Sequence, residues 1–379
     1  MKKLFTFLGV ILVMAGSATR AQEVNSSAPL QGSVSTADAT LEDGEDWIPS
    51  ISLDSRYSYD RVVGGDAAGF GGDGFYLYID GKISKHFSYS LCQRFFSANG
   101  EDDSVFDNTD WLTLSYHLGD FTFTAGKESM YIGSYEIAAD DIDSYYDLNS
   151  MFYNSLSTYQ WGASAMWTSK SENTSVVFQF ANSPFSYAPK QDNMYSYNLA
   201  WMSQSDYHDA TWSVNLVEYE PGEYVKIIAL GQTFYIGSFS LSLDYIERSA
   251  SWRSKLGEDF TLSVMPAVTF ADEKVRLFGK FGWEKCKDDL EYDFLGEYLT
   301  KEEMIAANEE CGTTLPAFKI GGEDYLYYGA GVEYFPIESV RLHAVWGSNN
   351  YTSRHTINIG ATWRFDITNA IRRIAGKCN

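Results

Sequence analysis

Apolar and polar residues alternate along most of the chain from Trp47 onward, in one short segment after another. A period of two is the pattern of a β-strand, because successive side chains point to opposite faces of a sheet. In the first segment, Ile51 and Leu53 share one face, whereas Asp54 and Arg56 share the other. We count about 16 such segments. Their apolar stripes, which we expect to face lipid, begin at Trp47, Phe75, Phe87, Leu112, Phe121, Tyr159, Val176, Tyr195, Trp212, Val225, Phe239, Phe260, Val275, Leu326, Val340 and Ile357.

The connections between the predicted strands alternate in length. After every second strand the connection is short, at 80–85, 119–120, 169–173, 204–209, 236–238, 271–273 and 335–338. The two longest connections, 128–155 and 284–323, both fall at the opposite end. Bacterial membrane barrels have short periplasmic turns and long extracellular loops. We therefore predict an all-β fold, a transmembrane antiparallel β-barrel over residues 47–367, rather than a soluble sandwich or propeller.

The strand faces opposite the apolar stripes are polar. A barrel of about 16 to 18 strands directs such faces into an aqueous channel. The basic residues predicted to line the pore are Arg56, Lys82, Arg94, Lys274, Arg276, Lys280, Arg341 and Arg364, and the predicted inward acids include Asp54, Asp80, Asp244, Glu284 and Glu333. Lys274, Arg276 and Lys280 are the best candidates for an anion-attracting wall. The alternative is a wetted wall whose charges are balanced by neighbouring acids.

The composition agrees with a membrane barrel. Aromatic residues make up 16% of the 379 residues, with 27 Tyr, 24 Phe and 10 Trp, and barrels need such residues for their interfacial girdles. The mean hydropathy is −0.25, as expected where only alternate residues face lipid. A formal net charge of −23 disfavours nucleic-acid binding, which needs a basic surface.

The first residues have the features of a secretory signal. Lys2 and Lys3 precede an apolar run at 4–14, and Thr19 and Ala21 suit cleavage before Gln22. We predict a signal peptide at 1–21, a flexible leader at 22–46 and a C-terminal periplasmic tail at 368–379, which could form a short amphipathic helix. No later apolar run approaches the ~20 residues of a membrane helix, so the secreted chain is either soluble or a barrel.

The two longest connections contain further candidate residues. In 128–155, Tyr residues interleave with the predicted constriction acids Glu136, Asp140, Asp141 and Asp143. If this loop folds into the lumen, its carboxylates favour cations; if it stays outside, they are a solvated charge run. The tyrosines could alternatively form a sugar-stacking surface. In 284–323, we predict a disulfide between Cys286 and Cys311 and a short helix beginning near Thr300.

Two segments resemble the phosphate-selective porin O and P family. The first is Leu-Gly-Asp-Phe-Thr-Phe-Thr-Ala-Gly-Lys at 118–127, followed by Met130, Gly133 and Glu136; the second is Tyr-Gln-Trp-Gly-Ala-Ser-Ala-Met-Trp at 159–167. The proline that usually follows Gly-Lys in the family is absent, and Glu128 stands there. The resemblance implies a porin whose third loop enters the lumen, a wall of Arg and Lys for phosphate, and a homotrimer.

Together these features predict a bacterial outer-membrane porin that contacts lipid and allows passive diffusion of small hydrophilic solutes or ions, possible anions such as phosphate among them. A loop-mediated adhesin or scaffold without transport is an alternative. A barrel-wall hydrolase is disfavoured, because the five His lie in no nucleophile motif and no metal-ligand pair appears. We expect no cofactor and no metal.

Overall fold

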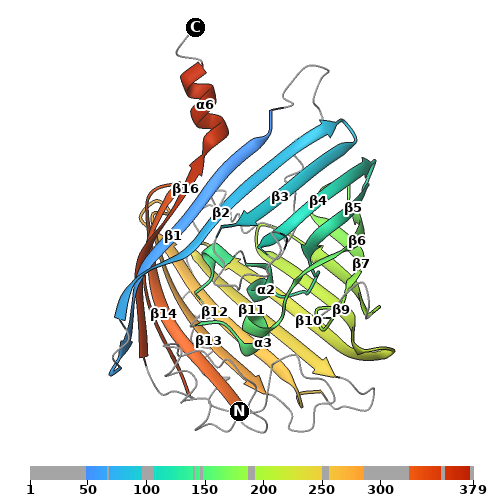
Figure 1. The fold of residues 1–379 in the computed structure, drawn as a ribbon. Coiled ribbons are helices and arrows are strands. Elements are labelled where there is room, and N and C mark those ends of the chain that lie inside the picture. The colour runs from blue at the N-terminus through green and yellow to red at the C-terminus, as the bar shows by residue number, and fades with distance from the viewer. Residues whose placement is uncertain are drawn as a thin grey trace.

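The computed structural model describes residues 48–65, 68–95, 106, 108–139, 141–145, 148–186, 193–249, 256–285, 324–350 and 355–375. Within these ranges, 16 antiparallel strands form one closed barrel, since β1 pairs with both β2 and β16 (Figure 1). The predicted fold class is confirmed. The strands are β1 (Ser50–Val63), β2 (Ala68–Ser84), β3 (Phe87–Arg94), β4 (Thr109–Leu118), β5 (Phe121–Ser129), β6 (Tyr159–Thr168), β7 (Thr174–Asn182), β8 (Tyr195–Ser203), β9 (His208–Glu220), β10 (Glu223–Ile236), β11 (Phe239–Ser249), β12 (Phe260–Phe270), β13 (Val275–Lys285), β14 (Asp324–Ile337), β15 (Val340–Asn349) and β16 (His355–Asp366).

The alternation of residues separates the outer surface of the barrel from the inner one. On β4 and β5, Leu114, Phe121 and Phe123 are exposed on the outer surface. Thr113 and Ser115, between them in the pattern, are buried on the inner surface. An apolar outer surface is what contact with lipid requires, and the inner surface is left for polar groups.

For strand β10, the prediction of which residues face lipid is wrong. Its predicted lipid-facing residues, Val225, Ile227 and Ala229, are buried inside the barrel, and Ile228 and Leu230 are exposed outside. Both faces of this strand are apolar, so a period of two could not distinguish them. Residues of the connection between β5 and β6 cover the inner face, which removes it from water.

The two ends of the barrel differ in the length of their connections. At one end the strands are joined through 85–86, 119–120, 169–173, 204–207, 237–238, 271–274 and 338–339. At the other end lie the long connections 130–158 and 286–323, in agreement with the predicted alternation. The predicted signal peptide, the whole of the predicted leader, Cys286, Cys311 and the helix near Thr300 lie outside the described residues.

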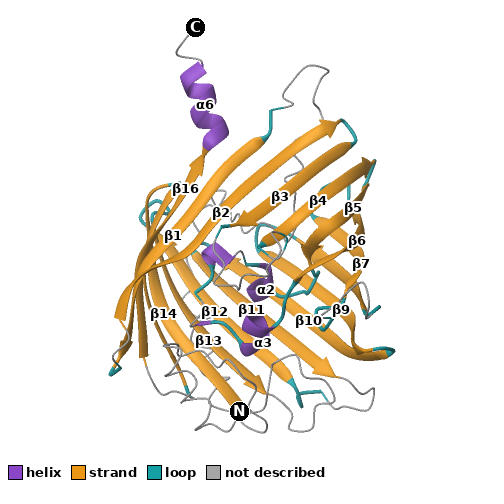
Figure 2. Ribbon diagram, viewed as in Figure 1, coloured by secondary structure: helices purple, strands orange, loops and turns teal. Residues whose placement is uncertain are grey.

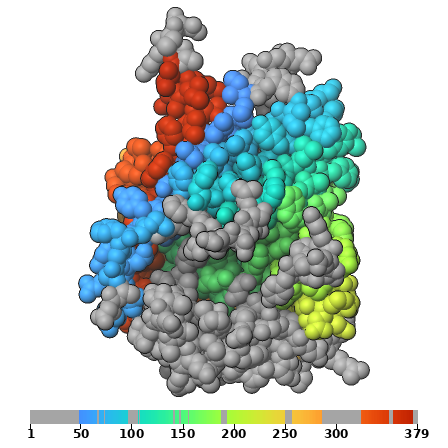
Figure 3. Space-filling view, in the orientation of Figure 1, coloured from blue at the N-terminus to red at the C-terminus, as the bar shows by residue number. Residues whose placement is uncertain are grey.

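Helix α6 (Ile367–Ala375) continues β16 at the short-turn end, where Figure 3 shows it in red projecting from the rim. Thr368 Oγ1 joins it to the start of β1, donating to Pro49 O and accepting from Ile51 N, both at 2.8 Å. Among the described residues, no helix has the length and apolar character needed to cross a membrane.

Among the described residues, three short helical segments lie inside the barrel, all in the connection between β5 and β6 (Figure 2). They are α2 (Tyr135–Ala138), η1 (Asp141–Asp143) and α3 (Met151–Ser155). We call residues 130–158 the lumen loop.

Candidate pore constriction

The first and last parts of the lumen loop pack together against an apolar inner wall. Met130, Ile132 and Phe152 are at most 1% exposed, although they belong to a connection rather than to the barrel. They form a hydrophobic cluster with Ile137 and Leu156 of the loop and with Val217, Val225, Ile227, Ala229 and Ile246 of β9–β11. Burial of this apolar area draws the loop onto the wall.

Polar contacts fix the register of the first part of the loop on β9. Asn215 Nδ2 donates to Tyr131 O at 2.8 Å, and Gly133 N donates to Ser213 Oγ at 2.8 Å. Gly133 lies so close to the strand that an added Cβ would stand 2.6 Å from Ser213 N. Only glycine allows this approach without a backbone shift.

A carboxylate of the wall caps the next helix. Asp244 on β11 accepts hydrogen bonds from Tyr135 N at 2.9 Å, Glu136 N at 2.8 Å and Ser134 Oγ at 3.1 Å. These N–H groups are the ones that a helix leaves without internal partners at its N-terminus. Asp244, predicted to face inward, therefore holds α2 to the wall.

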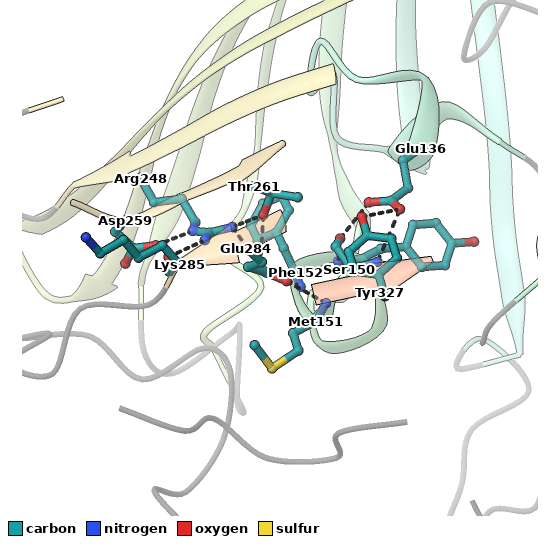
Figure 4. A network of polar contacts seen from close by, with 11 residues as sticks. Glu136, Ser150, Met151, Phe152, Arg248, Asp259, Thr261, Glu284, Lys285 and Tyr327 are labelled. Atoms are coloured by element: carbon teal, nitrogen blue, oxygen red, sulfur yellow. Dashed lines mark hydrogen bonds and ion pairs between the residues drawn. The ribbon is translucent and has the colours of Figure 1, made fainter. Parts of the chain in front are cut away.

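Two further carboxylates hold α3, one from the loop and one from the wall. Glu136 accepts from Ser150 N at 3.1 Å and Tyr327 OH at 3.2 Å, and it pairs with Lys280 at 2.7 Å. Glu284 on β13 accepts from Met151 N at 2.7 Å and from Phe152 N at 3.2 Å. Figure 4 shows both carboxylates at the start of α3.

The wall carboxylate belongs to a buried network that reaches the neighbouring strands (Figure 4). The Arg248 side chain is not exposed at all, and it lies 2.7 Å from Asp259 and 3.1 Å from Glu284. Thr261 Oγ1 lies between the two charges, 2.6 Å from Arg248 Nη1 and 2.8 Å from Glu284 Oε1. This network fixes the Glu284 carboxylate in the position where α3 needs it.

The tip of the lumen loop is clamped by arginines from β15 and β16. Asp143 lies 2.7 Å from Arg341 and 2.8 Å from Arg364, and Arg341 Nη2 also donates to Ile142 O at 2.8 Å. Burial by itself would raise the pKa of Asp143, but the two guanidinium groups outweigh it and lower the pKa below its ordinary value.

The return leg of the loop meets the barrel on β1, β13 and β14. Arg56 Nη1 donates to Ser144 O, and its guanidinium lies 4.6 Å from the centre of the Tyr145 ring. Tyr145 OH donates to Glu333 at 2.7 Å, and Glu333 also pairs with Arg276 at 2.8 Å. The loop is therefore tied to walls far apart around the barrel.

The structure thus brings five of the eight predicted cations, Arg56, Arg276, Lys280, Arg341 and Arg364, to the lumen loop or its partners. The other three lie elsewhere. Arg94 pairs with Asp110 on β4 at 2.8 Å, and Lys82 lies on β2 opposite Ser88. Lys274 is exposed in the turn before β13, because Ala271, Asp272 and Glu273 adopt positive φ and the strand begins only at Val275. It does not share a wall with Arg276 and Lys280.

The predicted constriction acids divide in a similar way. Glu136 and Asp143 form the ion pairs described above, Asp141 begins η1, and Asp140 lies outside the described residues. Sequence reasoning missed Arg248 and Asp259. Extending the alternation of β11 from Asp244 by four residues would have placed Arg248 on the inner face.

Among the described residues, no group of three or more His, Cys, Asp and Glu side chains is placed to hold a metal ion.

No family model and no curated protein sequence matches the chain. Solved structures do match. A loop L8 deletion mutant of OmpT, an outer membrane protein of Vibrio cholerae, is 13% identical with a TM-score of 0.55, and the match covers 84% of this chain and 100% of that one. A mutant of Rh. blastica porin is 11% identical with a TM-score of 0.54 and the same two coverages. OmpT of Vibrio cholerae expressed in the outer membrane is 12% identical with a TM-score of 0.54, over 85% of this chain and 99% of that one.

At these identities the likeness establishes the fold. The chain has a porin-like barrel of the kind found in outer-membrane proteins, which is consistent with a place in the bacterial outer membrane. The narrower resemblance to phosphate-selective porins is not confirmed by these matches.

Proposed function

We propose that the protein is an outer-membrane porin in which the lumen loop narrows a water-filled channel for small hydrophilic solutes. The observation that carries this proposal is the attachment of the loop to opposite walls. It is bonded to β9 through Gly133, to β13 through Glu136 and to β16 through Asp143. A loop fixed at such distant points forms a constriction of constant size, and a pore of constant size selects solutes by their size.

The charges at this constriction support weak ion selectivity. Lys280 is paired with the loop carboxylate Glu136, and Arg341 and Arg364 share Asp143. A ring of Arg and Lys favours anions when its charge is not compensated, whereas here each of these cations lies beside a carboxylate. We therefore propose small neutral or weakly charged solutes, and we do not favour phosphate as the preferred one.

We propose transport rather than catalysis, because the buried carboxylates Asp244 and Glu284 cap loop helices and Glu284 also pairs with Arg248. From the family resemblance we further propose that the protein is a homotrimer. A measurement of its native mass in detergent tests this proposal. We also propose that residues 1–21 are a signal peptide. N-terminal sequencing of the exported protein tests this proposal.

Planar-bilayer recording of the refolded protein under a KCl gradient tests the main proposal. We expect discrete conductance steps, a reversal potential near zero and little change when phosphate is added. An absence of conductance would exclude a porin. Strong anion selectivity with block by phosphate would show instead that the basic residues outweigh the loop carboxylates.

A further inference from the structure

Aromatic rings face the lumen on the wall of β2–β4. Tyr76 and Tyr78 lie on the inner face of β2, and Cys92 of β3 separates Tyr78 from Trp111 of β4 in the strand register. The ring centroids are 6.2 Å apart for Tyr76 and Tyr78, which stack, and 5.8 Å apart for Tyr78 and Trp111. The three rings therefore form a continuous aromatic strip across three strands.

This strip adjoins the tip of the lumen loop. Tyr76 is buried in a small cluster with Cys92 and the loop residue Ile142, and Tyr78 and Trp111 pack against the edge of that cluster. Tyr78 and Trp111 are only half-buried. Contact with the loop thus explains the position of Tyr76, whereas the other two rings keep surface that a solute in the lumen can reach.

Hydrogen-bonding groups lie directly beside the rings. Trp111 Nε1 donates to Ser90 Oγ at 2.7 Å, and Ser90 Oγ donates to the exposed Asp80 carboxylate at 2.6 Å. Nearer the short-turn end, His117 Nε2 lies 2.8 Å from Ser88 Oγ. A solute that leaves the rings in this direction therefore meets further hydroxyl, imidazole and carboxylate groups.

We infer that Tyr78 and Trp111, with Ser90 and Asp80, form a binding site for saccharides on this wall. A pyranose ring has C–H faces that pack on aromatic rings and hydroxyl groups that bond to carboxylates and hydroxyls, so it needs both kinds of group side by side. The ring spacing of 5.8 Å suits neighbouring sugar units of a linear oligosaccharide. The inference rests on the proposed porin function and names its solute class.

The charge balance at the constriction favours the same class of solute. Arg341 and Arg364 share Asp143, Arg364 is also paired with Asp54, and Lys280 is paired with Glu136. Three cations thus face three carboxylates, so passage gives little electrostatic advantage to an ion. An uncharged solute is then distinguished by contact with the walls, and the aromatic strip provides such contact.

Maltotriose is a suitable probe, and two measurements on the full chain test the inference. Calorimetric titration in detergent measures binding, and bilayer recording measures whether the sugar blocks the KCl current. We expect saturable block by maltotriose and no saturation with a polyethylene glycol of similar size. Tyr78→Leu and Trp111→Leu should each weaken binding about tenfold, equivalent to about 1.4 kcal/mol.

Two variants serve as controls. Trp363→Leu removes a ring of similar size from the lipid-facing surface and should leave binding unchanged. Trp111→Phe keeps an aromatic face but loses the hydrogen bond to Ser90, so it should weaken binding less than Trp111→Leu does. It also provides a test if Trp111→Leu does not fold.

The outcomes separate the site from the pore. Conductance without maltotriose binding would overturn the saccharide site and leave the porin proposal intact. Binding without conductance would support the site and overturn the porin proposal. Binding that is unchanged in folded Tyr78→Leu and Trp111→Phe would place the sugar elsewhere and overturn the inference.

Discussion

Replacing Glu284 by glutamine should loosen the lumen loop from the barrel wall. The Glu284 carboxylate is fully buried, and it accepts hydrogen bonds from the backbone N–H groups of Met151 and Phe152. It also pairs with the buried side chain of Arg248. Glutamine has the same shape, but one of its two terminal groups is a donor. A donor would then face either the start of α3 or Arg248.

The size of the effect follows from the burial of the network. Removing one partner of a buried ion pair costs about 3–5 kcal/mol, because a charge is left without compensation. Arg248 retains Asp259 at 2.7 Å, so we expect the lower end of that range, about 3 kcal/mol. This change corresponds to a shift of roughly a hundredfold in the equilibrium between the docked and the released loop.

Single-channel recording and proteolysis together measure loop release. Glu284→Gln should give larger and noisier conductance steps. Protease added to the reconstituted protein should cleave this variant within 130–158, and we expect the docked loop of the wild type to be protected. Glu223→Gln, at an exposed position at the start of β10, is the matched control. A folded Glu284→Gln barrel with wild-type conductance and protection would show that this network does not hold the loop.

Three further predictions concern the tip and the close approach of the loop. Asp143→Asn removes the carboxylate shared by Arg341 and Arg364. Because a unit charge about 5 Å from the ion path contributes roughly 0.8 kcal/mol in water, the reversal potential should shift towards anion selectivity. A shift towards cation selectivity would contradict this prediction. Because the pKa of Asp143 lies below its ordinary value of 3.8, its stabilising effect is present above that pH and is lost only as the pH falls through the lowered pKa. The difference in selectivity between the wild type and Asp143→Asn should accordingly persist from about pH 7 to about pH 4, and its loss near pH 6 would refute the assignment. Gly133→Ala should weaken docking of the lumen loop by about 1–3 kcal/mol, because the added Cβ would collide with the β9 backbone. Gly69→Ala is the control, since nothing lies within 4 Å of a Cβ added there. Equal protection of the loop from protease in both variants would contradict the expected collision.

The barrel could be predicted from the sequence because its signal is local and repeated. In β11, for example, Leu241 and Leu243 face outward and Asp244 faces inward, and each side chain follows from its neighbours. The parity of turn lengths repeats the same information at the scale of the whole chain. Neither signal needs any knowledge of which distant residues meet.

The path of the lumen loop could not be predicted in this way. The carboxylates of Glu136 and Asp143 look the same in sequence whether they face solvent or a wall. Their partners Lys280 and Arg341 lie 144 and 198 positions away, and only closure of the barrel brings them together. Sequence reasoning could therefore find the charges but not their pairing, and the pairing is what we propose sets the selectivity.

The apolar inner face of β10 connects the predictable strand pattern with the path of the lumen loop. A strand that is apolar on both faces would expose Val225 and Ile227 to water if the lumen were open beside it. The cluster with Ile132 and Phe152 removes that area from water, which supplies a driving force of roughly 25 cal/mol for each Å² buried. The same contact brings the start of α3 within reach of Glu284. Hydrophobic packing thus positions the loop, and the buried carboxylates then fix its orientation. A barrel strand that is apolar on both faces accordingly indicates that another segment of the chain packs against its inner face.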